Sequence, residues 1–226
     1  MLSIMKKELK NYFCTPIGYV IIAIFLIAFS AFFYLTAIKQ PSIDLTYIFY
    51  NTALYGLMFM IPLLTMWSIA GERKNGTDQL IMTAPVSMTK LVLAKFFAAT
   101  LIVIIPILFS VMYFVILAHY HTPDVPTYIL SAFGFFLLST TYISFGILSS
   151  SLTDSPIISA IITFAIIFIA MWLPLLIGKD EISLVYVFIN FLEAQLDWIS
   201  LVLFASLTVL CLLLTIIVMQ RRKSVK

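Results

Sequence analysis

The chain has 226 residues, of which 63% are hydrophobic and only 10% are charged, and its mean hydropathy is +1.14. A water-soluble domain carries about 25% charged residues, so this composition excludes a soluble globular protein. The net charge of +3 is small, and the basic residues fall in three short groups at the edges of apolar segments, which excludes a nucleic-acid partner.

Residues 1–15 are predicted to form an amphipathic helix that lies in the cytoplasmic headgroup layer. On a helical wheel, apolar side chains cover one face and basic or polar side chains cover the other. The residues on which this prediction depends are Met5, Lys6, Lys7, Leu9, Lys10 and Phe13. The alternative is a basic flank that only fixes the topology.

Six apolar stretches follow, each long enough to cross a hydrocarbon core about 30 Å thick as a helix. They are residues 17–38, 47–70, 92–118, 128–149, 157–178 and 199–219. Helices are required because lipid offers no hydrogen-bond partner to an open strand edge. The predicted fold class is an all-α membrane protein, one transmembrane domain over residues 1–226, with six transmembrane helices and an N-terminal interfacial amphipathic helix.

The distribution of Lys and Arg predicts the orientation, because these residues concentrate in cytoplasmic loops. With the N-terminus in the cytoplasm, Lys39 and Lys179 are outside and the rest of the 13 Lys and Arg residues are inside. We therefore expect a multi-pass protein of the plasma membrane with both termini cytoplasmic. Segment 71–91 is then a cytoplasmic loop and segment 179–198 an extracellular one.

The interiors of the predicted spans contain no Asp or Glu, and Lys95, near the start of the third, is their one basic residue. Ion-coupled transporters generally keep an ionisable side chain there, so any transport energy is expected to come from another subunit. The neutral polar residues are expected to form helix–helix hydrogen bonds. Alternatively, some of them line a path: Asn51, Thr52, Ser139, Thr140 and Ser144.

Motifs of common catalytic and nucleotide-binding sites are missing from the sequence. It contains no GxxxxGK[ST], HExxH or GxSxG motif, so we expect no ATP site, no cofactor and no enzymatic activity in this chain. His119 and His121 have only Asp124 nearby and are interpreted as residues of an outer loop, not as a metal site. An intramembrane enzyme would need paired acids or a metal cluster, which the spans do not offer.

Segment 71–91 is predicted to contain a short cytoplasmic helix. Asn75 can cap it, Asp78 lies near its positive end, and Pro85 should end it. Its apolar residues are Leu80, Ile81 and Met82. Exposed apolar side chains on such a helix indicate a docking surface, and the alternative is a loop helix packed on its own protein.

The same segment resembles the first cytoplasmic loop of ABC-2-type transporter permeases. The matching run is Glu72-Arg73-x-x-Gly76-Thr77-x-x-Leu80, followed by Pro85-Val86-Ser87 and then Val92-Leu93-x-Lys95-Phe96. It looks closest to the branch of gliding-motility and nitrous-oxide-cluster permeases. Weaker matches cover residues 149–154 and 188–197, and Gln79 departs from the family's usual acid.

The resemblance implies a permease subunit of an ATP-binding cassette exporter, without an ATPase site of its own. Two six-span subunits, identical or different, would pair around a central path, above two copies of a separate P-loop ATPase that binds ATP and Mg. The residues implied in coupling to that ATPase are Glu72, Arg73, Asn75, Gly76, Thr77, Asp78, Leu80, Ile81, Met82 and Pro85. The alternative function is a non-transporting assembly or scaffold subunit of an ATPase complex.

The substrate is not identified by any motif. Acidic residues of segment 179–198 could favour a cationic or amphipathic cargo such as a peptide: Asp180, Glu181, Glu193 and Asp197. Equally, these acids could only reflect the charge bias of an outer loop.

Overall fold

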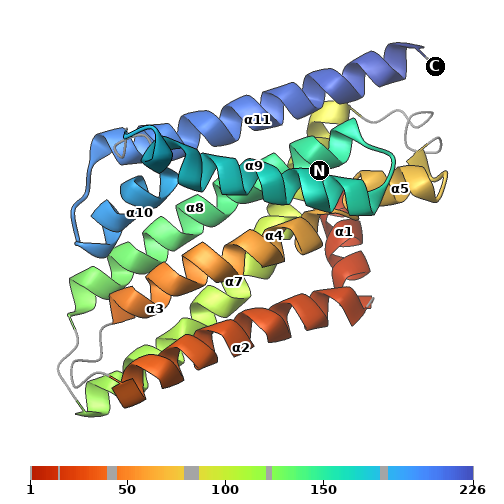
Figure 1. The fold of residues 1–226 in the computed structure, drawn as a ribbon. Helices are drawn as coiled ribbons and strands as arrows, with labels where there is room; N and C mark the ends of the chain where they lie inside the picture. The colour runs from red at the N-terminus through yellow and green to blue at the C-terminus, as the bar shows by residue number, and fades with distance from the viewer. Residues whose placement is uncertain are drawn as a thin grey trace.

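The computed structural model describes residues 2–14, 16–39, 45–78, 87–120, 124–178 and 183–225, and this part of the chain is all-α (Figure 1). The first half contains α1 (Leu2–Cys14), α2 (Pro16–Lys39), α3 (Leu45–Asn51), the π-helix η1 (Thr52–Leu57), α4 (Met58–Thr65), α5 (Ala70–Lys74) and α7 (Met88–Tyr120). The second half contains α8 (Val125–Leu152), α9 (Pro156–Leu176), α10 (Leu184–Leu192) and α11 (Trp198–Val225). Among the described residues, six segments are long and apolar enough to cross a membrane, which confirms the predicted fold class.

The second of these six segments is not one regular helix. It passes from α3 through η1 into α4, turns over Met66–Ser68, and resumes as α5. Pro62 inside α4 has no backbone N–H to donate. The prediction of a single span over residues 47–70 missed this division, because hydropathy reports apolar character and not helical regularity.

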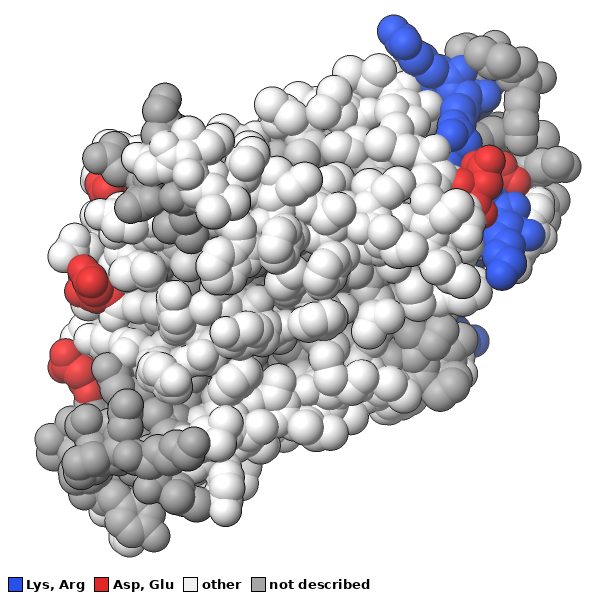
Figure 2. All heavy atoms as spheres, in the orientation of Figure 1, with Lys and Arg blue, Asp and Glu red and all other residues white. Residues whose placement is uncertain are grey.

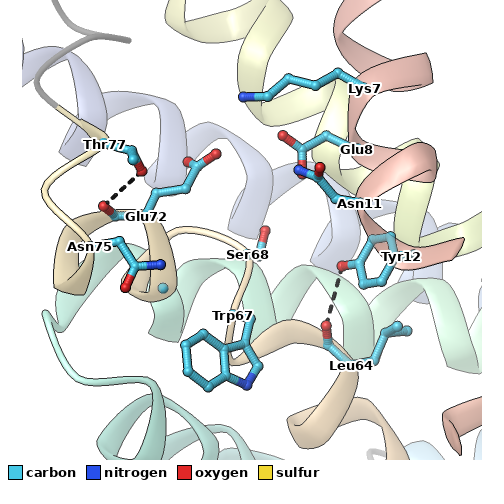
Figure 3. A pocket seen from close by; sticks show the side chains of 11 residues that line it. Lys7, Glu8, Asn11, Tyr12, Leu64, Trp67, Ser68, Glu72, Asn75 and Thr77 are labelled. Carbon is cyan, nitrogen blue, oxygen red and sulfur yellow. Dashed lines mark hydrogen bonds between the residues drawn. The ribbon is translucent and has the colours of Figure 1, made fainter. Parts of the chain in front are cut away.

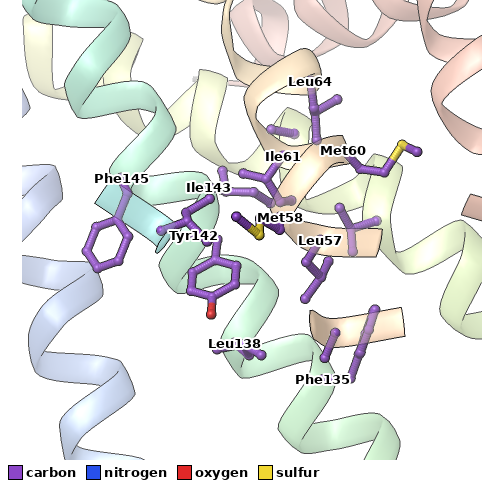
Figure 4. Close-up of a cluster of buried hydrophobic side chains, with 14 of the residues drawn as sticks. Leu57, Met58, Met60, Ile61, Leu64, Phe135, Leu138, Tyr142, Ile143 and Phe145 are labelled. Carbon is purple, nitrogen blue, oxygen red and sulfur yellow. The ribbon is translucent and has the colours of Figure 1, made fainter. Parts of the chain in front are cut away.

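Two segments form the centre of the bundle. The apolar windows of Leu45–Lys74 and Val125–Leu152 are 72% and 61% buried, against 22–28% for the other four. Figure 4 shows the core between them, where Leu57 and Ile61 from the second segment lie near Tyr142 and Ile143 of α8. The outer four segments therefore keep most of their apolar surface exposed, as helices solvated by lipid do.

Close approach of α8 to α4 depends on Gly146. A Cβ atom at this position would lie 2.1 Å from Oγ1 and 2.7 Å from Cβ of Thr65. Only glycine permits this backbone separation, which brings α8 directly against the turn that begins after Thr65.

The two ends of the bundle differ in charge. The basic end comprises α1, α5, the start of α7, the α8–α9 connection and the C-terminal part of α11, and the opposite end includes α10 (Figure 1). On the face shown in Figure 2, Lys and Arg gather at one end, acidic residues lie at both ends, and the described surface between is uncharged. This distribution is the one expected of a bundle whose middle lies in hydrocarbon.

Candidate functional site at the basic end

Helix α1 has a face that packs on the protein as well as the two predicted faces. Lys6, Lys7 and Lys10 are exposed, as expected for the basic face. Met5 and Leu9 are half-buried, and Phe13 is 37% exposed. Glu8 and Tyr12, one helical turn apart, instead point into the bundle, where Glu8 is only 7% exposed. The division into an apolar and a basic face did not reveal this contact surface.

Glu8 belongs to a buried ionic cluster that we call the triad, formed by Glu8, Lys95 and Glu72. The Lys95 Nζ atom lies 3.1 Å from Oε1 of Glu8 and 2.8 Å from Oε1 of Glu72. Lys95 is 2% exposed. It is therefore not a cation that merely marks the membrane edge but one that joins α1, α5 and α7. An ion pair at such depth needs all its partners, since a buried charge without one is strongly destabilising.

The triad also fixes the turn that follows α4. Lys95 donates a hydrogen bond of 2.7 Å to the backbone carbonyl of Ser68, and the Tyr12 hydroxyl donates one of 3.2 Å to the carbonyl of Leu64. These carbonyls lie where the helix is interrupted, so they need partners from elsewhere. Burial raises the pKa of Tyr12, with the charges of Glu8 and Glu72 adding to the effect. Its hydroxyl thus remains a donor at neutral pH.

Arg73, the residue after Glu72, reaches a different part of the bundle. Its Nη1 donates to the carbonyl of Thr153 at 3.0 Å and lies 3.4 Å from Oδ1 of Asp154. Arg222 of α11 lies 3.2 Å from the same Asp154 oxygen. We call Arg73, Asp154 and Arg222 the arginine network. The Arg73 side chain is 4% exposed whereas Asp154 is 76% exposed, so the network has one buried member and an open edge.

Ser150 of α8 supports the start of α5. Its hydroxyl accepts hydrogen bonds from the backbone N–H groups of Ile69 and Ala70 at 3.0 and 2.9 Å. These groups have no partner within their own short helix, and a hydroxyl from a neighbouring helix supplies it. Segment 149–154, one of the weaker matches to the ABC-2 permeases, begins in the last turn of α8, which ends at Leu152, and continues into the three-residue connection to α9.

The predicted coupling loop is described in part. Glu72 and Arg73 lie in α5, and Asn75 is the residue at its C-terminal end, not the N-cap that the sequence predicted. Gly76 follows with φ +70°, a conformation that glycine adopts readily after a helix. The Thr77 hydroxyl then donates to the carbonyl of Glu72. Asp78 is half-buried. Leu80, Ile81, Met82 and Pro85 lie outside the described residues.

The proposed path-lining residues lie buried or half-buried inside the helix bundle. Asn51 is 9% exposed, Thr52, Ser139 and Ser144 are at most 1% exposed, and Thr140 is half-buried. Asn51 and the three residues of α8 donate to carbonyls of their own helices. Their role in a path stays a prediction, and their burial in this conformation keeps most of them from contact with a cargo.

The structure describes only some of the histidines and acidic residues that were predicted to lie in outer loops. His119 lies at the end of α7, and His121 is outside the described residues, as are Asp180 and Glu181. Glu193 and Asp197 are exposed beside α10. Among the described residues, no group of three His, Cys, Asp or Glu side chains could hold a metal ion.

The fold and this charged end define a multi-pass helical membrane protein in which the triad and the arginine network hold α5, the helix that precedes the loop to α7. The family model described as "ABC-2 family transporter protein" matches residues 2–180, more than half of the chain. The chain therefore belongs to the ABC-2 family of transporter proteins, as a permease, the membrane component of an ATP-binding cassette transporter. A comparison with curated proteins gave no match.

Proposed function

We propose that this permease is driven by a separate P-loop ATPase that binds the loop between α5 and α7 from the cytoplasm, and that the subunit exports its cargo. The observation that carries the proposal is that two consecutive residues of α5 form ion pairs with different parts of the bundle. Glu72 joins the triad with α1 and α7, and Arg73 joins the arginine network with the α8–α9 connection and α11.

This anchoring suits the transfer of force. A displacement of the loop applied to α5 acts at once on α1 and α7 through Lys95, and on the α8–α9 connection and α11 through Asp154. Packed and ion-paired elements move together because their interfaces are not continuously deformable. The whole subunit, and not one helix, would then respond to the closure of the ATPase.

The remaining parts of the proposal follow from charge and family. The basic end faces the cytoplasm, because Lys and Arg concentrate there. Two permease subunits pair, each served by one copy of the ATPase, which holds the ATP and Mg. Exposed Glu193 and Asp197 at the opposite end favour a cationic or amphipathic cargo, such as a peptide, over an anionic one.

Leu80→Asp tests where the ATPase binds. A tagged wild-type permease, extracted in mild detergent, is expected to retain a P-loop ATPase through a hydrophobic contact of the loop. A charge placed in that contact should lower the amount of ATPase recovered by about tenfold or more, the effect of losing one central interface residue. Quantitative mass spectrometry of the purified complex measures the ratio of ATPase to permease.

Leu196→Asp is the matched control, since Leu196 is 60% exposed at the opposite end of the bundle. It makes the same chemical change and should leave the recovery of ATPase unaltered. Equal recovery with wild type, Leu80→Asp and Leu196→Asp would contradict the proposed docking loop.

A further inference from the structure

A cavity of about 380 Å³ opens at the basic end between α1 and the second membrane segment (Figure 3). Lys7, Glu8 and Asn11 line it from α1, and Glu72 lines it from α5. Its apolar wall includes Leu64 and Trp67. The size falls within the range of small-ligand sites, and charged side chains from both α1 and α5 face the opening.

The charges around this cavity cancel in sum, because Lys7 adds one positive charge to the net negative charge of the triad, but the two lie apart. In the triad, two carboxylates share the single ammonium of Lys95, which leaves one negative charge in excess. Figure 3 shows the Glu8 and Glu72 carboxylates approaching from opposite walls, with Lys7 extending across the same opening. A ligand that carries both an ammonium and an anionic group would complement the carboxylates and Lys7 together.

The depth of the cavity corresponds to the headgroup layer of a bilayer. Trp67, 39% exposed, lies at the interruption between α4 and α5, and the Lys74 ammonium is 5.9 Å from the centre of its ring. Tryptophan and lysine in this arrangement are typical of the membrane–water boundary. Trp67 is the partly exposed apolar residue of the cavity lining, and acyl chains would lie against it.

We propose that this cavity binds a phosphoethanolamine group, with the primary ammonium on Glu72 and Glu8 and the phosphate on Lys7. The phospholipid that presents this group at a membrane surface is phosphatidylethanolamine, and the soluble source is free phosphoethanolamine. A primary ammonium has three N–H donors for carboxylate oxygens, whereas a trimethylated one has none. A bound headgroup would join α1 to α5, the two elements that the triad already connects.

Methylation of the headgroup nitrogen provides the test on the wild-type protein. The full chain is placed in bilayer nanodiscs with equal amounts of phosphatidylethanolamine and its mono-, di- and trimethylated forms. Native mass spectrometry then counts the lipids retained after release. Retention is expected to fall with each added methyl group, by about tenfold from the unmethylated to the trimethylated lipid, since charge-assisted hydrogen bonds are lost.

Two pairs of variants locate the site. Glu72→Gln should reduce the preference for phosphatidylethanolamine, and Glu193→Gln, exposed at the opposite end, should not. Lys7→Gln should reduce retention of all four phospholipids, and Lys6→Gln, exposed on the same helix, should not. If Glu72→Gln fails to fold, the methylation series on the wild type still tests whether the protein prefers a primary ammonium.

Competition separates the two sources of the ligand. Displacement of the retained lipid by free phosphoethanolamine supports a site for a soluble ligand, and resistance to it supports a lipid site that also holds the acyl chains. Equal retention of all four phospholipids by the wild type, or equal loss in Lys7→Gln and Lys6→Gln, overturns the proposal. No ATPase is present, so this result is independent of the proposed coupling.

Discussion

Replacing Lys95 with methionine is expected to destabilise the folded protein by about 3–5 kcal/mol, the effect of removing one partner from a buried ion pair. The substitution keeps an unbranched side chain of similar length but leaves Glu8 and Glu72 together without their cation. The carbonyl of Ser68 also loses its donor. Because the triad joins three elements, α1 should separate from the bundle first.

Thermal unfolding followed by fluorescence-detected size exclusion in detergent measures this change. Lys90→Met is the control, since Lys90 is exposed in the first turn of the same helix. The triple variant Glu8→Gln, Lys95→Met, Glu72→Gln should recover much of the lost stability, because it leaves no charge in the triad. Equal unfolding temperatures of Lys95→Met and Lys90→Met would show that the triad does not stabilise the fold.

Replacing Gly146 with alanine is expected to destabilise the bundle by about 1–3 kcal/mol through overpacking. The new methyl group would meet the Cβ and Cγ2 atoms of Thr65 at 2.7 and 2.8 Å as well as its hydroxyl. Rotation of the hydroxyl alone cannot relieve contacts with the rest of the side chain. The helices α8 and α4 must therefore move apart, which disturbs the core in Figure 4.

Gly56→Ala is the control for this effect. Its added methyl group would lie 3.0 Å from Cγ2 and 3.9 Å from Cβ of Thr52, so a small shift relieves the contact. Both substitutions replace a helical glycine with alanine, so a larger loss of unfolding temperature in Gly146→Ala reports the collision. A variant Gly146→Ala that is as stable as Gly56→Ala would contradict the close packing of α8 on α4.

The membrane fold could be predicted from sequence because its signal is long and repeated. An apolar stretch of about 20 residues has one physical interpretation when charged side chains are absent from it. The interruption after Thr65 was not predictable in this way. It depends on Ser150, 81 residues from Ile69, whose hydroxyl satisfies the backbone groups released by the turn, and no local pattern reports such a distant partner.

The triad and the arginine network were only partly predictable from the sequence. Glu72 and Arg73 were found through the family's loop motif, but their separate partners were not. A signal for the triad did exist: Lys95 is the one charged residue in a predicted span, and such a residue usually has a partner. Glu8, the one acid of a basic amphipathic helix, is one of its two partners, beside Glu72. Glu8 and Lys95 could be paired only once α1 was placed across the start of α7.

Through Glu72 and Arg73, α5 connects the triad, with α1 and α7, to the arginine network, with the α8–α9 connection and α11. Glu72 and Arg73 are consecutive, so side chains on a short helix point about 100° apart and can reach different neighbours. The double variant Glu72→Gln, Arg73→Gln removes the charges by which α5 joins the triad and the arginine network, and it leaves the residues of the following loop unchanged. It therefore separates binding of an ATPase from transfer of its movement.

Hydrogen–deuterium exchange in the permease–ATPase complex, with and without ATP, tests this central claim most directly. In the wild type, ATP should change the exchange of α1, α5 and the α8–α9 connection together. In the double variant the ATPase should stay bound, and the response should be lost in α1 and in the connection. A response that persists in both segments without the anchors, or no response in the wild type, would contradict the account.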